Sequence, residues 1–571
     1  MSDSTATSVP HPWERLYPKD VNWRARIPTG PLHSLLDDAV KAHGARIAID
    51  FLGRRLTYAE LGQLADRAAK GLQGVGVGKG TKVCLMLPNC PAYVIGYFAI
   101  LKAGGVVVNV NPLNAEAEIR GQIEDSDADV LITLDLAPIF AKAQKMLGAT
   151  RLKRIVVCRF AEQLPALKGT LFKLLKRKML AAVPREERLV DWSSLLANDG
   201  RFTRHECAPA HDVALLQYTG GTTGLPKAAM LTHANVYANA HQSLLYFPQT
   251  RHGQEIMLGV LPYFHVFAMT TCMNFSLLSG ATMLLLPRFE IELLLKTIEK
   301  KRPTFMPAVP TIYIALNNHK DVIAKKRDLS SLRVCISGGA AMPIEVMNTF
   351  EKLTGCTVVE GYGLSESSPV AIVNPSTGKR KPGSLGLPVS GTIVEITSID
   401  EPSRVLPQGE RGEICLRGPQ VMLGYWKRSE ESEKTLADGR LHTGDVGYID
   451  DEGYVFLIDR LKDIILCGGY NVYPRHVEEA IYQHPAVAEV TVIGVPDPYR
   501  QQSPKAFVRL REGQSLSADT LIAFLKDKLS PIEMPREIEF RTELPKTLIG
   551  KLSKKELVAE EAGRKPAAST N

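Results

Sequence analysis

The sequence has little that would support an extracellular, disulfide-bonded fold. Its nine cysteines are odd in number, and no two are spaced as Cys-x-x-Cys. Most of them lie in apolar runs, such as Val83-Cys84-Leu85 and Val334-Cys335-Ile336, which is typical of buried free thiols in a reducing compartment. The first ten residues are small and polar, without the basic segment and apolar run of a secretory leader. We therefore expect a cytoplasmic protein.

A strong excess of either charge is also absent. The chain has 69 Lys and Arg against 61 Asp and Glu, which gives a formal net charge of +8 at pH 7. Without a clustered basic face, this mild excess does not favour nucleic-acid binding, so we expect no nucleic-acid partner. It suits an enzyme that handles phosphates or acids.

Long uncharged runs are scarce. Residues 256–287 carry no Asp, Glu, Lys or Arg, and this length would allow a membrane span. However, Pro262, His265, Asn274 and Gly280 interrupt the run. We expect a strand, a loop, a helix and a strand in a buried core instead.

Apolar runs alternate with helical patterns from residue 48 onward. Thr57-Tyr-Ala-Glu60 is typical of a capping box, and it predicts a helix that continues through Leu72. Buried strands are expected at 82–87 and 106–110, with a helix at 90–102 between them. This alternation predicts an α/β fold with doubly wound, mostly parallel sheets whose two faces are covered.

The pattern changes near residue 380. Short strands then follow at close spacing, which predicts a β-rich subdomain at about 380–460 inside an N-terminal domain of residues 1–462. A compact α+β pattern follows, and we expect a small mobile C-terminal domain at 463–571. Two domains or more agree with a length of 571 residues, because domains commonly have about 100–200.

A loop rich in glycine and threonine follows the apolar strand expected at 213–218. It reads Tyr218-Thr-Gly-Gly-Thr-Thr-Gly-Leu-Pro-Lys227. Backbone N–H groups at glycines, threonine hydroxyls and one lysine together can hold a polyphosphate. It is not a Walker A loop, because Pro226 separates the last glycine from the lysine and a strand, not a helix, is expected next. We predict a hairpin-like clamp made by Thr219, Gly220, Gly221, Thr222, Thr223, Gly224 and Lys227.

This loop closely resembles the phosphate-binding signature of acyl-adenylate-forming enzymes, which include acyl-CoA synthetases, luciferases and peptide-synthetase adenylation domains. The resemblance covers roughly residues 45–560 and implies an acyl-CoA synthetase-like fold. It also implies ATP, Mg²⁺ and the co-substrate CoA.

Two later segments resemble the nucleotide-binding signatures of the family. Ser337-Gly-Gly-Ala-Ala341 ends an apolar strand with small residues, which leave room for a flat ring at the position where open α/β sheets bind ligands. Glu360-Gly-Tyr-Gly-Leu-Ser-Glu366 resembles the core signature, with serine where threonine is usual. The resemblance makes Glu366 a magnesium ligand, in keeping with the oxygen ligands that this cation prefers. The implied nucleotide-binding residues are Gly338, Gly339, Ala340, Gly361, Tyr362, Gly363 and Ser365.

The next segments resemble the ribose and hinge motifs. Leu441-His-Thr-Gly-Asp445 implies that Asp445 binds the ribose hydroxyls, although fatty-acid ligases often have tryptophan where Arg440 stands. In Ile458–Asp463, Arg460 is implied to reach the nucleotide, and Lys462 stands at the hinge. Gly469 is implied to line the path of CoA after the C-terminal domain has rotated.

Two segments supply the catalytic candidates besides Lys227. Leu261-Pro-Tyr-Phe-His265-Val-Phe resembles the segment whose histidine lies beside the acid pocket, although a histidine in an apolar run is often only packed. Leu544–Lys551 resembles the terminal signature, whose lysine carries the adenylation step. Lys554 and Lys555 follow nearby, so a solvated basic stretch is the plain interpretation of this segment without the family.

The overall pattern resembles bacterial long-chain fatty-acid ligases. Pocket walls are expected from 237–245, 265–271 and 308–313, which are mostly apolar or small. Medium-chain, dicarboxylic and aryl acids remain alternatives, as does an acyl-AMP ligase that serves a carrier protein. A non-enzymatic relative should have lost the charged groups that this chain retains.

One segment is basic and apolar together. In 164–188, Leu171, Leu174, Leu175 and Met179 can form one helix face, with Lys173, Lys176 and Arg177 beside it. Such a face suits either an ordinary surface helix or peripheral contact with the inner membrane surface. A homodimer is also kept open.

Overall fold

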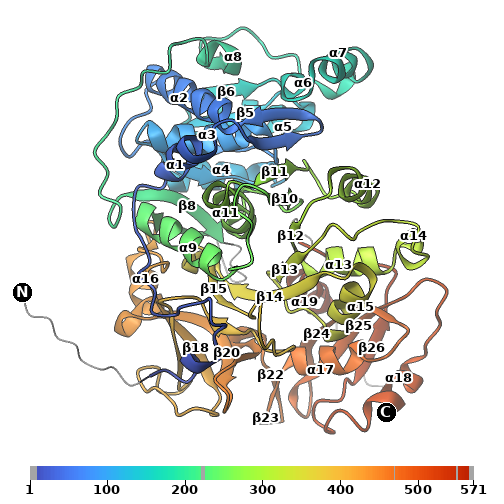
Figure 1. Cartoon of the computed structure of the whole chain (residues 1–571). Coiled ribbons are helices and arrows are strands. Elements are labelled where there is room, and N and C mark those ends of the chain that lie inside the picture. The colour runs from blue at the N-terminus through green and yellow to red at the C-terminus, as the bar shows by residue number, and fades with distance from the viewer. Residues whose placement is uncertain (1–9, 220–225, 469, 548–550, 565–571) are drawn as a thin grey trace, which may run out of the picture.

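The computed structural model describes residues 10–219, 226–468, 470–547 and 551–564. Four sheets organise them (Figure 1). Within this described part, no helix has the length and apolar character that crossing a bilayer requires. All nine cysteines are free thiols, and every one except Cys207 is buried, as expected from the apolar runs.

The first large sheet has eight strands in the order β19-β9-β8-β4-β3-β5-β6-β7. Its strands from β8 to β7 are parallel, and the β8–β9 and β9–β19 pairs are antiparallel. The bounds are β3 (Lys82–Leu85), β4 (Val106–Asn109), β5 (Ala128–Leu134), β6 (Arg154–Cys158), β7 (Leu189–Asp191), β8 (Val213–Thr219), β9 (Lys227–Thr232) and β19 (Gly424–Tyr425).

The second large sheet has nine strands in the order β16-β15-β14-β13-β12-β10-β11-β1-β2. Its central strands are parallel, and both ends carry antiparallel partners. The bounds are β1 (Ile47–Phe51), β2 (Arg54–Thr57), β10 (Ile256–Gly259), β11 (Thr282–Leu285), β12 (Phe305–Ala308), β13 (Val334–Gly338), β14 (Thr357–Gly363), β15 (Val370–Val373) and β16 (Leu387–Pro388).

Helices cover these two sheets. Every residue of α3 is buried, and α3 shares one core cluster with strands of both sheets. The longer helices are α1 (Ser34–His43), α2 (Tyr58–Gly74), α3 (Pro91–Lys102), α4 (Glu116–Ser126), α5 (Ala137–Ala149), α7 (Ala166–Leu175), α9 (His233–Leu245), α12 (Ile291–Lys301), α13 (Pro310–Asn317) and α15 (Ile344–Thr354). The shorter ones are α6 (Phe160–Gln163), α8 (Trp192–Leu195), α10 (Val266–Ala268), α11 (Phe275–Ser279), α14 (Lys320–Ile323) and α16 (Ser429–Thr435).

Two local predictions are confirmed. Thr57 Oγ1 accepts a hydrogen bond from Glu60 N–H, and the Glu60 carboxylate accepts one from Thr57 N–H at 2.7 Å, so the capping box begins α2. The uncharged run at 256–287 forms β10, a buried helical stretch over 266–279 and β11. It belongs to the protein core.

The remaining strands form two smaller sheets. A four-stranded antiparallel sheet contains β17 (Ile393–Thr397), β18 (Gly412–Arg417), β20 (Leu441–Ile449) and β21 (Val455–Arg460). The last sheet contains β22 (Ile465–Cys467), β23 (Tyr470–Val472), β24 (Val487–Asp497), β25 (Gln501–Leu510) and β26 (Glu537–Phe540). It packs with α17 (Pro474–Tyr482), α18 (Ala518–Leu525) and α19 (Lys554–Gly563).

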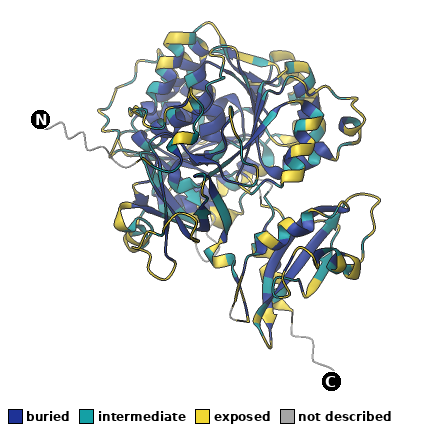
Figure 2. Cartoon of the chain, turned by 60° about the horizontal axis from the view of Figure 1, so that its bottom comes forward, coloured by how far each residue is buried: buried dark blue, intermediate teal, exposed yellow. Residues whose placement is uncertain are grey.

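The C-terminal part has hydrophobic clusters of its own, separate from those of the large sheets. Figure 2 shows buried strands inside both the larger body and this smaller one. The predicted α/β architecture is therefore confirmed. The boundary at residue 462 remains a prediction, and in this structure it falls between β21 and β22.

Candidate functional site

The phosphate loop connects two antiparallel strands. Tyr218 pairs with Ala228, and Thr219 pairs with Lys227, at the end of the β8–β9 hairpin next to the connecting loop. Lys227 begins a strand and not a helix, so the exclusion of a Walker A loop is confirmed. The predicted donors Gly220, Gly221, Thr222, Thr223 and Gly224 lie outside the described residues. The structure describes the two strand ends, at Thr219 and Lys227, that the loop connects.

Tyr425 contacts both Lys227 and Glu366. The Lys227 ammonium lies 5.4 Å from the ring centre of Tyr425 and 3.1 Å from a carboxylate oxygen of Glu431. Tyr425 donates a hydrogen bond to Glu366 Oε1 at 2.8 Å. Burial raises the pKa of the Glu366 carboxyl, and the Tyr425 hydrogen bond opposes that shift. A cation beside Glu366 would therefore favour its ionised form.

Tyr425 and Glu431 had no predicted role. The pairing of β19 with β9, in which Tyr425 faces Ala229, brings Tyr425 to the hairpin. No local feature of the sequence predicts that the segment Gly424-Tyr425-Trp426 returns to pair with β9.

The expected adenine site lies at the carboxyl ends of β13 and β14. These strands are parallel, with Gly338 beside Gly361. Small residues are needed here, because a β-carbon on Gly338 would lie 2.9 Å from the Phe267 ring. Gly339 has φ +82°, a conformation that favours glycine. Ala340 follows directly, so the predicted small-residue edge exists as a surface next to the His265 segment.

The predicted ribose group is held by two neighbours. Tyr362 donates a hydrogen bond to Asp445 Oδ2 at 2.7 Å, and Arg460 Nε lies 3.4 Å from Asp445 Oδ1. Burial raises the pKa of Asp445, and the Arg460 charge lowers it. The register of β20 and β21 places Asp445 opposite Arg460. The structure thus joins Tyr362, Asp445 and Arg460, which lie far apart in the sequence.

Three other predicted residues adjoin this group. Gly363 ends β14 where a β-carbon would clash with the Pro369 carbonyl oxygen. Ser365 opens the short helical turn that contains Glu366. Lys462 lies in the turn after Arg460, and its pKa is lowered by burial and by the Arg460 charge. Gly469 lies outside the described residues.

Glu413 is a residue that sequence reasoning missed. Its Oε1 accepts a hydrogen bond from Gly444 N–H at 2.8 Å, and its Oε2 lies 2.8 Å from His442 Nδ1. Both bonds fix the part of β20 that leads into Asp445. Arg440, the departure from the family pattern, lies 2.9 Å from Glu395 and so contacts the β-rich sheet.

Lys551 enters this site from the C-terminal part. A β-carbon on Gly339 would lie 2.7 Å from Lys551 Cε. Burial lowers the pKa of Lys551 to about 8, with a further lowering by Arg460 that Asp445 opposes. The lysine therefore lies between the predicted adenine edge and the ribose group.

His265 lies on the other side of this lysine. Burial, and then the Lys551 charge, lower the pKa of His265 to about 3, so its ring is neutral near pH 7. Nδ1 accepts a hydrogen bond from Phe267 N–H at 3.3 Å, which leaves the ring proton on Nε2. A neutral imidazole of this kind can donate to an acid oxygen without adding charge.

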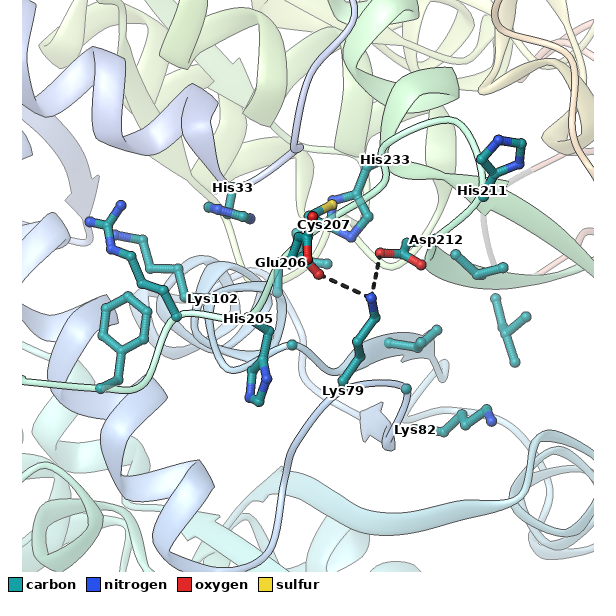
Figure 3. A pocket seen from close by; sticks show the side chains of 18 of the residues that line it. His33, Lys79, Lys82, Lys102, His205, Glu206, Cys207, His211, Asp212 and His233 are labelled. Atoms are coloured by element: carbon teal, nitrogen blue, oxygen red, sulfur yellow. Dashed lines mark hydrogen bonds and ion pairs between the residues drawn. The ribbon is translucent and has the colours of Figure 1, made fainter.

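A separate cavity of about 230 Å³ lies away from these residues (Figure 3). Its charged side chains are largely paired with one another. Lys79 lies 3.3 Å from Asp212, and the buried Lys102 contacts Asp37. Lys82 and Arg204 also line it, each beside an aromatic ring, and we assign the cavity no function.

Comparisons with known proteins agree with this geometry. The family model described as AMP-binding enzyme matches residues 36–426, and the model described as AMP-binding enzyme C-terminal domain matches 476–551. The long-chain-fatty-acid–CoA ligase of Bacillus subtilis (strain 168) is 44% identical over 553 residues, which is 96% of this chain and 98% of that protein. The protein of the same name from Escherichia coli O157:H7 is 37% identical over 97% of this chain and 98% of its own length.

Other relatives act on different acids. A feruloyl-CoA synthase of an Amycolatopsis species is 36% identical over 88% of this chain and 94% of its own length. The solved structure of the anthranilate CoA ligase AuaEII in complex with anthranoyl-AMP has a TM-score of 0.83 at 26% identity, and covers 94% of this chain and 98% of that one. By these matches and by its fold, the chain belongs to the AMP-binding enzyme family.

Proposed function

We propose that the chain activates a fatty acid, most specifically a long-chain one, in two steps. ATP and the acid give acyl-AMP and pyrophosphate, and CoA then gives acyl-CoA and AMP. The observation that supports this best is Lys551, which reaches Gly339, His265 and the Asp445–Arg460 pair from a separate part of the chain. Two relatives that are named long-chain-fatty-acid–CoA ligases agree with this activity.

In the first step a carboxylate oxygen attacks the α-phosphorus of ATP. The new P–O bond forms as the bond to the bridging oxygen breaks, and pyrophosphate leaves with that electron pair. Both reactants are anionic, so Lys227 and Lys551 would offset their repulsion most strongly in the transition state. His265 would donate a hydrogen bond from its Nε2–H to a carboxylate oxygen of the acid.

A magnesium ion fits beside Glu366. The carboxylate has Tyr425 as its hydrogen-bond donor and faces the base of the phosphate hairpin, where Lys227 also lies. Mg²⁺ would supply charge neutralisation on the phosphate oxygens. Asp445 would accept hydrogen bonds from the ribose hydroxyls, and the Arg460 charge opposes the rise in the pKa of Asp445 that burial causes.

In the second step the CoA thiol sulfur attacks the acyl carbon. The C–S bond forms, the mixed anhydride C–O bond breaks, AMP leaves with that electron pair, and the thiol proton passes to solvent. We propose that the C-terminal part rotates about Lys462 between the steps, which withdraws Lys551 and brings Gly469 to the CoA path.

The acid is inferred from the expected pocket walls. Residues 237–245, 265–271 and 308–313 contain no Lys or Arg, so a second carboxylate would find no cation there. The stretches 237–245 and 269–274 pack against each other as α9 and a buried helical turn. This supports a monocarboxylic acid with an alkyl chain. The feruloyl-CoA synthase relative keeps an aryl acid as the second candidate.

An acid panel tests the proposal. AMP release by the full-length protein is measured for C6 to C18 fatty acids, ferulate, benzoate and malonate, with and without CoA. We expect the highest kcat/KM with long-chain acids, and AMP release that requires CoA. An equal rate of AMP release with and without CoA would indicate an acyl-AMP ligase. A higher kcat/KM for ferulate than for fatty acids would overturn the fatty-acid assignment.

Two finer parts of the proposal concern association. Peripheral contact with a membrane is proposed because long-chain acids partition into bilayers. A homodimer is proposed as the second form of association.

A further inference from the structure

The short helix α7 exposes its apolar face to solvent. The exposed fractions are 74% for Leu167, 45% for Leu171, 71% for Leu174 and 76% for Leu175. Their spacing of four, three and one residues places them on one side of a helix. Met179, in the turn that follows, is 48% exposed. Exposed apolar side chains grouped in this way mark an interaction surface.

The opposite side of α7 fixes this orientation. Gly169 is buried against α6, where a β-carbon would clash with the Ala161 carbonyl oxygen. Phe172 stacks obliquely on Phe160 with ring centres 5.0 Å apart. Because these contacts anchor one side of the helix, the leucines cannot turn inward without breaking them.

The leucine face lies in a strongly basic segment. Residues 164–185 contain no Asp or Glu, whereas Lys173, Lys176, Arg177 and Lys178 follow one another closely and are all exposed. A second copy of this chain is a poor occupant, because a symmetric contact would bring two such cationic segments together. An anionic surface with an apolar interior matches both the charge and the leucines.

We propose that the docking face, defined as Leu167, Leu171, Leu174, Leu175 and Met179 with the cations at 173 and 176–178, binds the anionic surface of a phospholipid bilayer. In Figure 1, α7 lies at the end of the molecule opposite to α17 and α18. Docking there leaves the C-terminal part free to rotate. The binding itself does not depend on the proposed activity, although that activity would explain why an enzyme should rest where its acid partitions.

Vesicle sedimentation of the full-length protein, without ATP, acid or CoA, tests the proposal. We expect binding to vesicles of phosphatidylcholine with 30% phosphatidylglycerol, and at least tenfold weaker binding to phosphatidylcholine alone. The triple variant Lys173→Gln, Lys176→Gln, Lys178→Gln should bind the anionic vesicles roughly 100-fold more weakly, given the attraction that each cation adds near such a surface. The matched control is Lys296→Gln, Lys300→Gln, Lys320→Gln, on exposed positions of α12 and α14, and it should bind like the wild type.

A second triple variant tests the apolar part. Leu171→Ser, Leu174→Ser, Leu175→Ser should lose vesicle binding with an unchanged melting temperature. The control Leu113→Ser, Ile323→Ser, Val405→Ser alters residues that are 61%, 58% and 46% exposed elsewhere, and it should bind normally. The proposal would be overturned if the wild-type protein bound neither vesicle type, or if the leucine and lysine variants both bound the anionic vesicles as tightly as the wild type. A dimer that the leucine variant converts to monomer without any vesicle binding would also overturn it.

The activity is measured separately, as AMP release with a water-soluble short acid in the absence of vesicles. All variants should match the wild type in that assay. If the wild type fails there with every acid but still binds vesicles, the proposed function falls and the docking face stands. If the wild type is active with an acid but does not bind vesicles, only the proposal of the docking face is overturned.

Discussion

Asp445 and Lys551 serve the same nucleotide in the proposed reaction, but the chain holds them in different ways. Asp445 lies on β20, opposite Arg460 on β21, and receives a hydrogen bond from Tyr362 on β14. Glu413, on a fourth strand, β18, accepts a hydrogen bond from the Gly444 N–H just before Asp445. Removing this carboxylate from the site would require several strands to separate.

Lys551 is held locally. Its backbone N–H donates to Thr547 Oγ1 at 3.1 Å, and its carbonyl oxygen accepts from Thr547 N–H at 2.7 Å. The segment belongs to the C-terminal part, which has hydrophobic clusters of its own. A rigid movement of that part can therefore withdraw the lysine without unfolding anything. The difference indicates a permanent nucleotide-binding framework and a removable catalytic cation.

The largest expected effect separates the two half-reactions. Lys551→Ala should lower acyl-AMP formation by about 10³-fold, because a charge that stabilises the transition state is lost. Formation of acyl-CoA from supplied acyl-AMP should stay within a factor of about three, since the lysine is withdrawn in that step. Pyrophosphate release and thioester formation are measured separately. Lys555→Ala, on a nearby exposed residue, is the control. An equal fall in both half-reactions would contradict a removable cation.

The opposite variant should affect the other step. Gly469→Leu is expected to slow acyl-CoA formation from acyl-AMP by about 10²-fold, because the added side chain would narrow the CoA path. Acyl-AMP formation should be nearly unchanged. Gly513→Leu, on an open turn of the same C-terminal part, controls for a general effect of substituting a glycine. Undiminished CoA transfer in Gly469→Leu would remove this residue from the path.

The framework itself is tested at the ribose. Asp445→Asn should raise KM for ATP by about 30-fold, because two charge-assisted hydrogen bonds weaken and Arg460 loses its partner. KM for the acid should change little. Asp438→Asn, on a turn close to β20, is the control. A comparable rise in KM for both substrates would indicate damage to the fold and not a lost ribose contact.

The smallest expected effect is a pH dependence. Since the pKa of Lys551 is lowered to about 8, its charge is present below that pH and is lost above it. Acyl-AMP formation should fall about tenfold between pH 7 and pH 9, whereas the CoA step should lack this decline. Lys551→Arg keeps its charge across this range, so the decline should disappear in that variant. A decline that persists in Lys551→Arg would belong to another group.

Local patterns predicted much of the fold. The capping box at Thr57, the β–α alternation and the interrupted uncharged run all depend on neighbouring residues, and each forms the expected elements. The motif residues Gly338, Asp445 and Lys551 followed from the resemblance to acyl-adenylate-forming enzymes, because each family motif is contained in a few consecutive positions.

Long-range pairing decided the rest. The sequence by itself determined which residues carry charge, glycine and hydroxyl groups for an acid-activating site. Only the tertiary structure decided that Tyr425 joins Lys227 to Glu366. It also decided that Glu413 holds the part of β20 before Asp445, and that the leucines of α7 face outward. Each of these depends on contacts between segments distant in sequence, which no local period or spacing records.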